Sequence, residues 1–153
     1  MLSASATSRG RRMTIAYDPQ NIFAKIILGT LPAYKVYEDD ATIAFMDVMP
    51  QGTGHTLVIP KNPSRNLLDT DIAVLPDLIA TVQKIARAVV SAFSADGVSV
   101  LQFNEPAAGQ TVFHLHFHVI PRFEGIALQR HAGSIEKAEI LQAHAQKIRD
   151  ALA

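Results

Sequence analysis

Residues 113–121 carry the pattern that most constrains the fold, because three histidines alternate with large apolar side chains in Phe-His-Leu-His-Phe-His-Val-Ile-Pro. Successive side chains of a β-strand point to opposite faces, so a strand over Val112–Pro121 puts all three imidazoles on one face. These are His114, His116 and His118. The apolar side chains of the strand then pack against a long helix, and we expect the imidazoles to be exposed or to line a cleft.

Apolar spacing also predicts the other elements of the chain. The longest periodic stretch predicts a helix over Ile72–Phe93, capped near Asp71 and with Pro76 in or near its first turn. Shorter patterns predict a helix from Asn21 to Gly29 and a surface helix over Ser134–Leu152. The remaining strands are expected as a hairpin, a third strand paired with it, and one strand after the long helix: Tyr34–Glu38, Thr42–Asp47, His55–Ile59 and Val98–Asn104.

Length and composition predict one globular domain at 17–153, because 153 residues with 48% hydrophobic content suffice for a single core. Residues 1–16 are expected to be a flexible N-terminal extension. They contain Arg9, Arg11 and Arg12 and no acidic residue, so an organelle transit peptide is the alternative.

The net charge of zero, without a run of Lys or Arg, argues against a polymeric nucleic acid as partner. The absence of cysteine excludes disulfides and thiolate zinc sites. No apolar run approaches the roughly 18 to 20 residues that cross a bilayer, so we expect a soluble protein that does not bind membranes. A cytoplasmic location follows, with organelle targeting by the N-terminal extension as the alternative.

Three interpretations of the histidine row stay open from the residues alone. The imidazoles could share a polar strand face without function. They could bind zinc, since imidazoles two apart on a strand can ligate one ion, with His55 or a carboxylate as the third ligand. They could also perform covalent catalysis, in which the central His116 attacks phosphorus and protonated neighbours stabilise the developing charge.

The segment His-Leu-His-Phe-His-Val-Ile resembles the signature of the histidine-triad (HIT) superfamily. Further segments resemble its Hint branch, so the likeness covers roughly residues 21–122. They are residues 21–27, 37–40, 44–48, 55–61, 104–105 and 109–111.

The resemblance implies an α+β HIT-like fold, a five-stranded antiparallel sheet with one long helix and short terminal helices. It also implies a homodimer in which the sheets join across the long helix and the Val98–Asn104 strand. His116 would form a nucleotidyl-imidazole intermediate, His114 and His118 would flank the phosphate, and His55 would add a fourth imidazole. No metal or other cofactor is implied.

By the same resemblance, further residues would contact the phosphate, the ribose and the base of the nucleotide substrate. Asn104, Gln110 and Thr111 would touch the phosphate or the leaving group. Asp47 would accept hydrogen bonds from the ribose hydroxyls. The purine base would occupy an apolar slot formed by Ile22, Phe23, Leu31, Phe45 and Val48.

Two departures from the family pattern bear on chemistry. Many bacterial relatives hold zinc with a Cys-x-x-Cys pair and a downstream histidine, and here Asn21, Ala24 and Pro63 occupy those positions, so a structural zinc of that type is excluded. Pro121-Arg122 replaces glycines that Hint proteins often have, as in the dinucleoside-polyphosphate branch.

The expected activity is therefore cleavage of a nucleoside 5′-monophosphate from an amine or another leaving group, as in nucleoside phosphoramidases. The alternatives are a dinucleoside polyphosphate hydrolase or nucleotidyltransferase, and a purine-nucleotide-binding scaffold dimer without catalysis.

Overall fold

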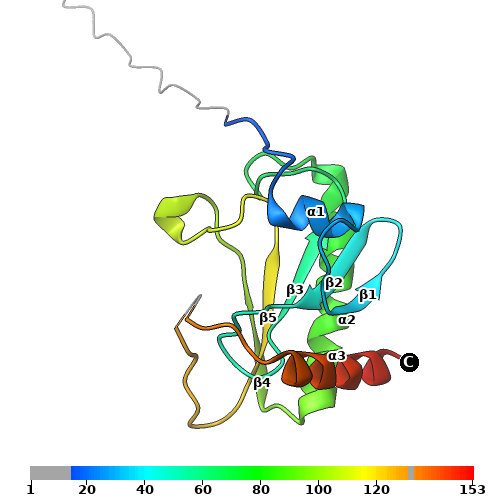
Figure 1. The fold of residues 1–153 in the computed structure, drawn as a ribbon, viewed down its shortest axis with the longest axis vertical. Coiled ribbons are helices and arrows are strands. Elements are labelled where there is room, and N and C mark those ends of the chain that lie inside the picture. The colour runs from blue at the N-terminus through cyan, green and yellow to red at the C-terminus, as the bar shows by residue number, and fades with distance from the viewer. Residues whose placement is uncertain (1–14, 131–132) are drawn as a thin grey trace, which may run out of the picture.

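A computed structural model describes residues 15–130 and 133–153, and its centre is a five-stranded antiparallel sheet with helices on both faces (Figure 1). The strands follow the order β1-β2-β3-β5-β4. Their bounds are Lys35–Glu38 for β1, Thr42–Met46 for β2, Thr56–Pro60 for β3, Gly97–Leu101 for β4 and Phe117–Arg122 for β5. The sheet, the long helix and the terminal helices confirm the predicted α+β fold class. Of the predicted N-terminal extension at 1–16, residues 1–14 lie outside the described residues.

The hairpin between β1 and β2 is confirmed, and its turn is organised by one carboxylate. Asp39 Oδ1 accepts hydrogen bonds from the backbone N–H groups of Ala41 and Thr42, both at 2.8 Å. Its Oδ2 accepts from the Tyr37 hydroxyl at 2.7 Å. Burial alone would raise the pKa of Asp39, but these hydrogen bonds outweigh it and lower the pKa to about 2.

One face of the sheet is covered by α2 (Leu75–Phe93), which a 3₁₀ turn at Ile72–Val74 precedes. The turn begins at Asp71, whose side chain accepts from the Ala73 N–H, and Pro76 lies in the first turn of α2. Both positions agree with the prediction. Helix α2 buries Leu78, Ile85 and Val89, which pack with β2, β3 and β5.

Helix α3 (Ala138–Leu152) packs against α2 and β1, so it is more than the surface helix that the sequence predicts. Its residues Leu141, Ala145 and Ile148 recur at helical spacing and are buried in the same core as α2. The other side of α3 is exposed. Among the described residues, no helix has the length and apolar content that crossing a bilayer requires, and the expected cytoplasmic location stays a prediction.

The opposite face of the sheet is covered by α1 (Ile22–Leu28), between the Asn21 cap and Gly29. Gly29 has a φ of 79°, a left-handed conformation that glycine adopts without strain and that ends the helix as predicted. Phe23 and Ile26 of α1 pack on alternate residues of β2 and β3. These are Ile43, Phe45, Leu57 and Ile59, whereas Ala44, Met46 and Val58 face α2.

Two strand boundaries differ from the prediction by more than one residue, and one of them changes the histidine row. Strand β4 ends at Leu101 instead of Asn104, and β5 begins at Phe117 instead of Val112. The chain ahead of β5 bonds to the loop after β3, where the Leu115 N–H donates to the Ser64 carbonyl at 2.8 Å.

The expectation of an exposed histidine face is wrong as well. His114, His116 and His118 are 0%, 7% and 2% exposed, and at least one ring nitrogen of each faces a polar group inside the protein. His116 and His118 nevertheless line a cleft, as the alternative expectation has it.

Candidate active site

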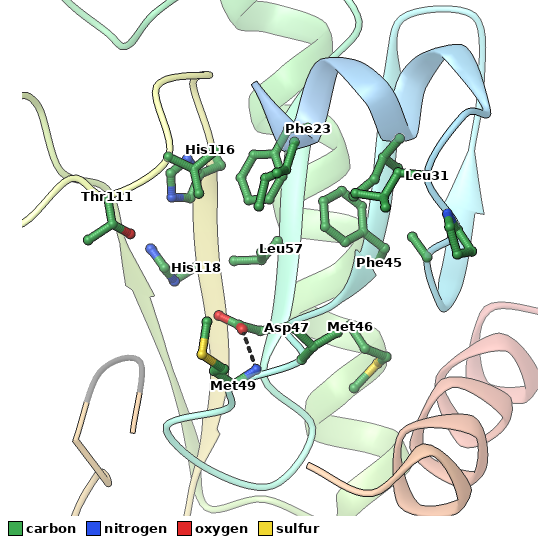
Figure 2. Close-up of a pocket in the computed structure, with 16 residues that line it drawn as sticks. Phe23, Leu31, Phe45, Met46, Asp47, Met49, Leu57, Thr111, His116 and His118 are labelled. Carbon is green, nitrogen blue, oxygen red and sulfur yellow. Dashed lines mark hydrogen bonds between the residues drawn. The ribbon is translucent and has the colours of Figure 1, made fainter. Parts of the chain in front are cut away.

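A pocket with a cavity volume of about 290 Å³ lies between α1, β2 and the start of β5. Its wall is mainly apolar, formed by side chains such as Phe23, Phe45 and Leu57 (Figure 2). Four polar side chains line the cavity as well: Asp47, Thr111, His116 and His118. An apolar slot with a few converging polar groups is typical of a site for a small molecule that has one apolar and one polar part.

The ring of His116 is fixed in one tautomer by the backbone. Its Nδ1 lies 2.6 Å from the carbonyl oxygen of His114. A carbonyl oxygen only accepts hydrogen bonds, so Nδ1 carries the proton and Nε2 of the neutral ring carries the lone pair. Phe23 packs edge-on against the ring with a centroid distance of 5.0 Å. The backbone thus fixes the orientation of the His116 ring in the pocket wall.

His55 and His118 form a hydrogen-bonded pair whose protons can be placed in the same way. The backbone N–H of Gln51 donates to Nδ1 of His55 at 3.0 Å, so the proton of neutral His55 is on Nε2. His55 Nε2 lies 2.9 Å from Nδ1 of His118, which therefore accepts. His118 then carries its proton on Nε2, and it lines the pocket together with His116. The two rings thereby fix each other's tautomer beside His116.

Asp47 completes this cluster at the end of β2. Its Oδ2 lies 3.4 Å from Nε2 of His55. Its Oδ1 accepts a hydrogen bond from the backbone N–H of Met49 at 2.9 Å, drawn as a dashed line in Figure 2. The carboxylate therefore has a fixed orientation in the pocket lining.

Potential ligand atoms of Asp47, His55 and His118 all lie within 4.8 Å of one another, so this cluster contains one histidine of the row where the zinc interpretation expects two. The donor set nevertheless fits a metal poorly. Nε2 of His55 would have to lose its proton to bind the ion, and the proton would then move to Nδ1, which faces the donating N–H of Gln51. The geometry of this cluster favours a shared proton over a metal ion.

His114 lies outside the pocket, although the resemblance places it beside the phosphate. Nε2 of its ring donates to the carbonyl oxygen of Pro60 at 2.8 Å, and Nδ1 accepts from the hydroxyl of Tyr17 at 2.6 Å. Burial lowers the pKa of His114, so the ring is neutral near pH 7. The backbone carbonyl of His114 accepts a hydrogen bond from the His116 ring.

The three side chains expected to touch the phosphate do not all lie in the pocket lining. Thr111 lines the pocket, whereas Asn104 and Gln110 do not. Asn104 Oδ1 accepts from the backbone N–H of Leu67 at 2.9 Å. Gln110 is buried, and its Oε1 accepts from the N–H of Glu105 at 2.7 Å while its Nε2 donates to backbone carbonyls. These two amides stabilise the loop that precedes Thr111.

The loop contains a strained residue that sequence patterns did not indicate. Glu105 has φ 73° and ψ 160°, a region that is almost reserved for glycine. Arg65 donates two hydrogen bonds to its carboxylate at 2.8 and 2.9 Å, and Asn66 donates a third at 2.5 Å. The hydrogen bond from Arg65 is the main reason that the pKa of Glu105 is lowered. These contacts hold the loop in one conformation.

The residues expected around the nucleoside all line the pocket, as the resemblance implies: Ile22, Phe23, Leu31, Phe45, Asp47 and Val48. Sequence reasoning missed Met49, which also lines the pocket, and Tyr17, which contacts His114. Tyr17 and His114 are 97 residues apart in sequence, so no local pattern could pair them.

Comparison with known proteins agrees with this architecture. The family model of the HIT domain matches residues 29–125. A crystal structure described as a Hit-like protein involved in cell-cycle regulation from Bartonella henselae, with unknown ligand, is 60% identical, covers 89% of this chain and 99% of its own, and has a TM-score of 0.84. A Zn-bound histidine triad family protein from Mycobacterium smegmatis is 34% identical, covers 87% of this chain and 93% of its own, and has a TM-score of 0.76.

A relative with a named activity is the adenylylsulfatase HINT3 of Arabidopsis thaliana. It is 34% identical over 141 residues, which are 88% of this chain and 72% of the relative. The match to the family model covers more than half of the chain, and it includes all three histidines of the alternating row. The chain therefore belongs to the HIT family.

Proposed function

We propose that the protein is a hydrolase that cleaves a nucleoside 5′-monophosphate from an amine or another simple leaving group through a nucleotidyl-His116 intermediate. The observation that carries the proposal is the 2.6 Å hydrogen bond from Nδ1 of His116 to the His114 carbonyl, which puts the lone pair of a pocket imidazole on Nε2. The adenylylsulfatase name of the Arabidopsis relative supports hydrolysis at an adenylyl group.

The first step follows from the proton positions in the site. Nε2 of His116 attacks the phosphorus, the bond from phosphorus to the leaving nitrogen breaks, and the amine departs with a proton from solvent. The Nε2–H of His118, which His55 orients through Nδ1, donates a hydrogen bond to a phosphoryl oxygen as charge develops on it. Splitting the displacement in two avoids direct attack by water on the substrate.

The second step regenerates the enzyme. Water attacks the same phosphorus, the bond from phosphorus to Nε2 breaks, and the nucleoside monophosphate leaves while the proton of the water passes to solvent. The hydrogen bond from Nδ1 to the His114 carbonyl holds the ring in the same orientation in both steps. His116 therefore returns to its starting tautomer.

The shape of the pocket supports a nucleoside as the other part of the substrate. A purine would pack against apolar side chains such as Phe23 and Phe45, and the Asp47 carboxylate in the pocket lining would accept from ribose hydroxyls. The slot has few polar groups that would distinguish one purine from another, so we expect purine preference with modest selectivity.

Cleavage of dinucleoside polyphosphates has less support. The sequence argument for it rests on Pro121-Arg122, and both residues lie within β5, outside the pocket lining. The Arg122 side chain donates to the Ser99 hydroxyl at 3.1 Å, on the neighbouring strand β4. Nothing in this arrangement brings the guanidinium to a second phosphate group.

The test is turnover of adenosine phosphoramidate by wild-type protein, by His116→Ala and by the control His144→Ala. His144 lies on α3, outside this pocket, so its variant removes an imidazole without touching the site. We expect His116→Ala to lose at least about a thousandfold in kcat/KM and His144→Ala to match the wild type.

Mass spectrometry after rapid quench supplies the second measurement. An acid-labile nucleotidyl adduct is expected in the wild type and absent in His116→Ala. Equal turnover in wild type and His116→Ala contradicts the proposal. Tight nucleotide binding without turnover or adduct favours the scaffold alternative instead. Faster cleavage of a dinucleoside polyphosphate than of the phosphoramidate favours the second enzyme alternative.

A further inference from the structure

The carbonyl group that fixes the tautomer of His116 lies outside the sheet. The ladder between β3 and β5 starts with Val58 paired to Phe117, and the ladder between β4 and β5 reaches only His118. Residues 114–116 therefore have no strand partner to hold their backbone. The His114 carbonyl must be positioned by other contacts if His116 is to keep one orientation.

Three hydrogen bonds supply that positioning. The backbone N–H of Leu115 donates to the Ser64 carbonyl at 2.8 Å. The His114 ring donates from Nε2 to the Pro60 carbonyl at 2.8 Å and accepts at Nδ1 from the Tyr17 hydroxyl at 2.6 Å. The ring of His114 is thus held from both nitrogens, and its backbone is held through the next residue.

The bond from Tyr17 determines whether the His114 ring can stay in place. Because Nε2 faces a carbonyl, the proton of the neutral ring is on Nε2 and Nδ1 must accept. His114 is fully buried, so an acceptor left without a donor there carries a desolvation penalty that a turn of the ring or a shift of the backbone would relieve. Either movement displaces the carbonyl that holds His116.

Tyr17 is suited to this task by its surroundings. Its ring packs against the His114 ring in an edge-on arrangement, with centroids 5.7 Å apart and an interplanar angle of 65°. Burial raises the pKa of Tyr17 and outweighs the opposing effect of the Asn21 side chain, so the hydroxyl keeps its proton and remains a donor throughout the neutral range.

We propose that Tyr17 is a positioning residue for the nucleophile: its hydroxyl holds the His114 ring, and through the His114 carbonyl it fixes the tautomer and orientation of His116. The proposal rests on the proposed function in so far as His116 is the nucleophile. Tyr17 does not line the pocket, so it acts on the reacting nitrogen without touching the nucleotide.

The experiment compares Tyr17→Phe with the wild type and with Tyr37→Phe as matched control. The Tyr37 hydroxyl contacts Asp39 and Lys84, away from the pocket. In Tyr17→Phe we expect the single-turnover rate of nucleotidyl-His116 formation from adenosine phosphoramidate to fall by about ten- to a hundredfold. The Kd for adenosine monophosphate should change by less than about twofold, because the slot for the nucleoside is intact. Tyr37→Phe should match the wild type in both.

Nitrogen-15 spectra of the histidine rings provide a readout that does not depend on activity. In the wild type, His114 should be Nε2-protonated with an accepting Nδ1, and His116 should be Nδ1-protonated. In Tyr17→Phe the His114 Nδ1 signal should move toward the value of a non-bonded nitrogen, and the His116 signals should indicate a mixture of tautomers. Tyr37→Phe should leave both rings unchanged.

Each outcome decides the matter. Wild-type rates with unchanged ring spectra in Tyr17→Phe overturn the proposal, and so does an equal loss of adduct formation and of nucleotide affinity, which a general structural role would produce. If the wild type forms no adduct, the proposed function fails, and the ring spectra still test the positioning role. If Tyr17→Phe does not fold, the wild-type nitrogen-15 spectrum tests the contact instead. An unprotonated, accepting Nδ1 of His114 supports the proposal, and a protonated Nδ1 overturns it, because it could not accept from the Tyr17 hydroxyl.

Discussion

The orientation of the His114 side chain could not be predicted from the sequence. The alternation of residues 113–119 assigns its side chain to the same face as the other two imidazoles. That assignment holds only while the backbone continues as a strand, and β5 begins at Phe117. Contacts with Tyr17 and Pro60, which are 97 and 54 residues away, decide where His114 points.

The buried His114 ring predicts a dependence of stability on pH. Its pKa is lowered in the folded state, so below the ordinary pKa of about 6.5 the unfolded chain binds a proton that the folded chain does not. Stability should therefore be lost as the pH falls below about 6.5, by at most ~1.4 kcal/mol per pH unit from this residue.

Urea unfolding of the wild type and of His114→Gln between pH 7.5 and 5.5 measures this effect. The free energy of unfolding of His114→Gln should be lower at pH 7.5 but should fall less steeply as the solution is acidified. His144→Gln is a useful comparison, because burial lowers the pKa of His144 as well, though that ring is only half-buried. Parallel pH curves for the wild type and His114→Gln would contradict the explanation.

Gln110 is buried outside the pocket lining, whereas the resemblance places it at the phosphate, and a substitution can test which of the two holds. In Gln110→Ala the partly buried N–H of Glu105 and the Arg65 carbonyl lose their partner, which should reduce the free energy of unfolding by about 1–3 kcal/mol. Thermal unfolding measures this loss, and nucleotide titration measures affinity. A variant with wild-type stability and much weaker nucleotide binding would favour direct contact with phosphate.

The β1–β2 hairpin is an element that the sequence predicted well, since short apolar strands flank Asp39-Asp40-Ala41. Asp39→Ala removes the acceptor for Ala41, Thr42 and Tyr37, and we expect the free energy of unfolding to drop by about 1–3 kcal/mol at pH 7. The pKa of about 2 means that this contribution is present above about pH 4 and is lost as the pH falls toward 2.

Asp40→Ala is the matched control, because Asp40 is exposed beside Asp39 and should change stability by less than about 0.5 kcal/mol. Denaturant unfolding at pH 7 and pH 3 compares the two variants. Equal losses at both positions would mean that the turn does not depend on the Asp39 hydrogen bonds.

The ends of α1 and the start of α2 could be predicted from the sequence more closely than the end of β4 and the start of β5. Asn21, Gly29, Asp71 and Pro76 carry local capping chemistry, and the ends of α1 and the start of α2 follow from it. The start of β5 and the end of β4 depend on which neighbour pairs with the backbone. That choice is made by the loop around Ser64 and by the strained Glu105, and neither is visible in a local pattern.

At the scale of the whole molecule, we propose a homodimer formed across β4 and α2. Strand β4 is at the edge of the sheet, and Val100 on it is 43% exposed. An unprotected edge with an exposed apolar side chain is suited to pairing with a second copy. Sedimentation equilibrium should give twice the mass of one chain for the wild type.

Val100→Lys should shift this equilibrium toward the monomer, since a charge would be buried in the interface. Leu28→Lys adds the same charge on the exposed side of α1 and should leave the dimer intact. A monomeric wild type, or equal dissociation of both variants, would refute this mode of assembly.

The family model covers residues 29–125, and parts of the pocket come from outside these bounds. Helix α1 supplies Ile22 and Phe23, and the Glu136 N–H bonds to the Val48 carbonyl at 2.8 Å on the opposite side. His116 thus lies within the residues that the family model matches, while part of the apolar pocket wall comes from α1, outside them. Because α1 lies outside the matched residues, a substitution at Ile22 would change the apolar wall that meets a ligand while the histidine row stays the same.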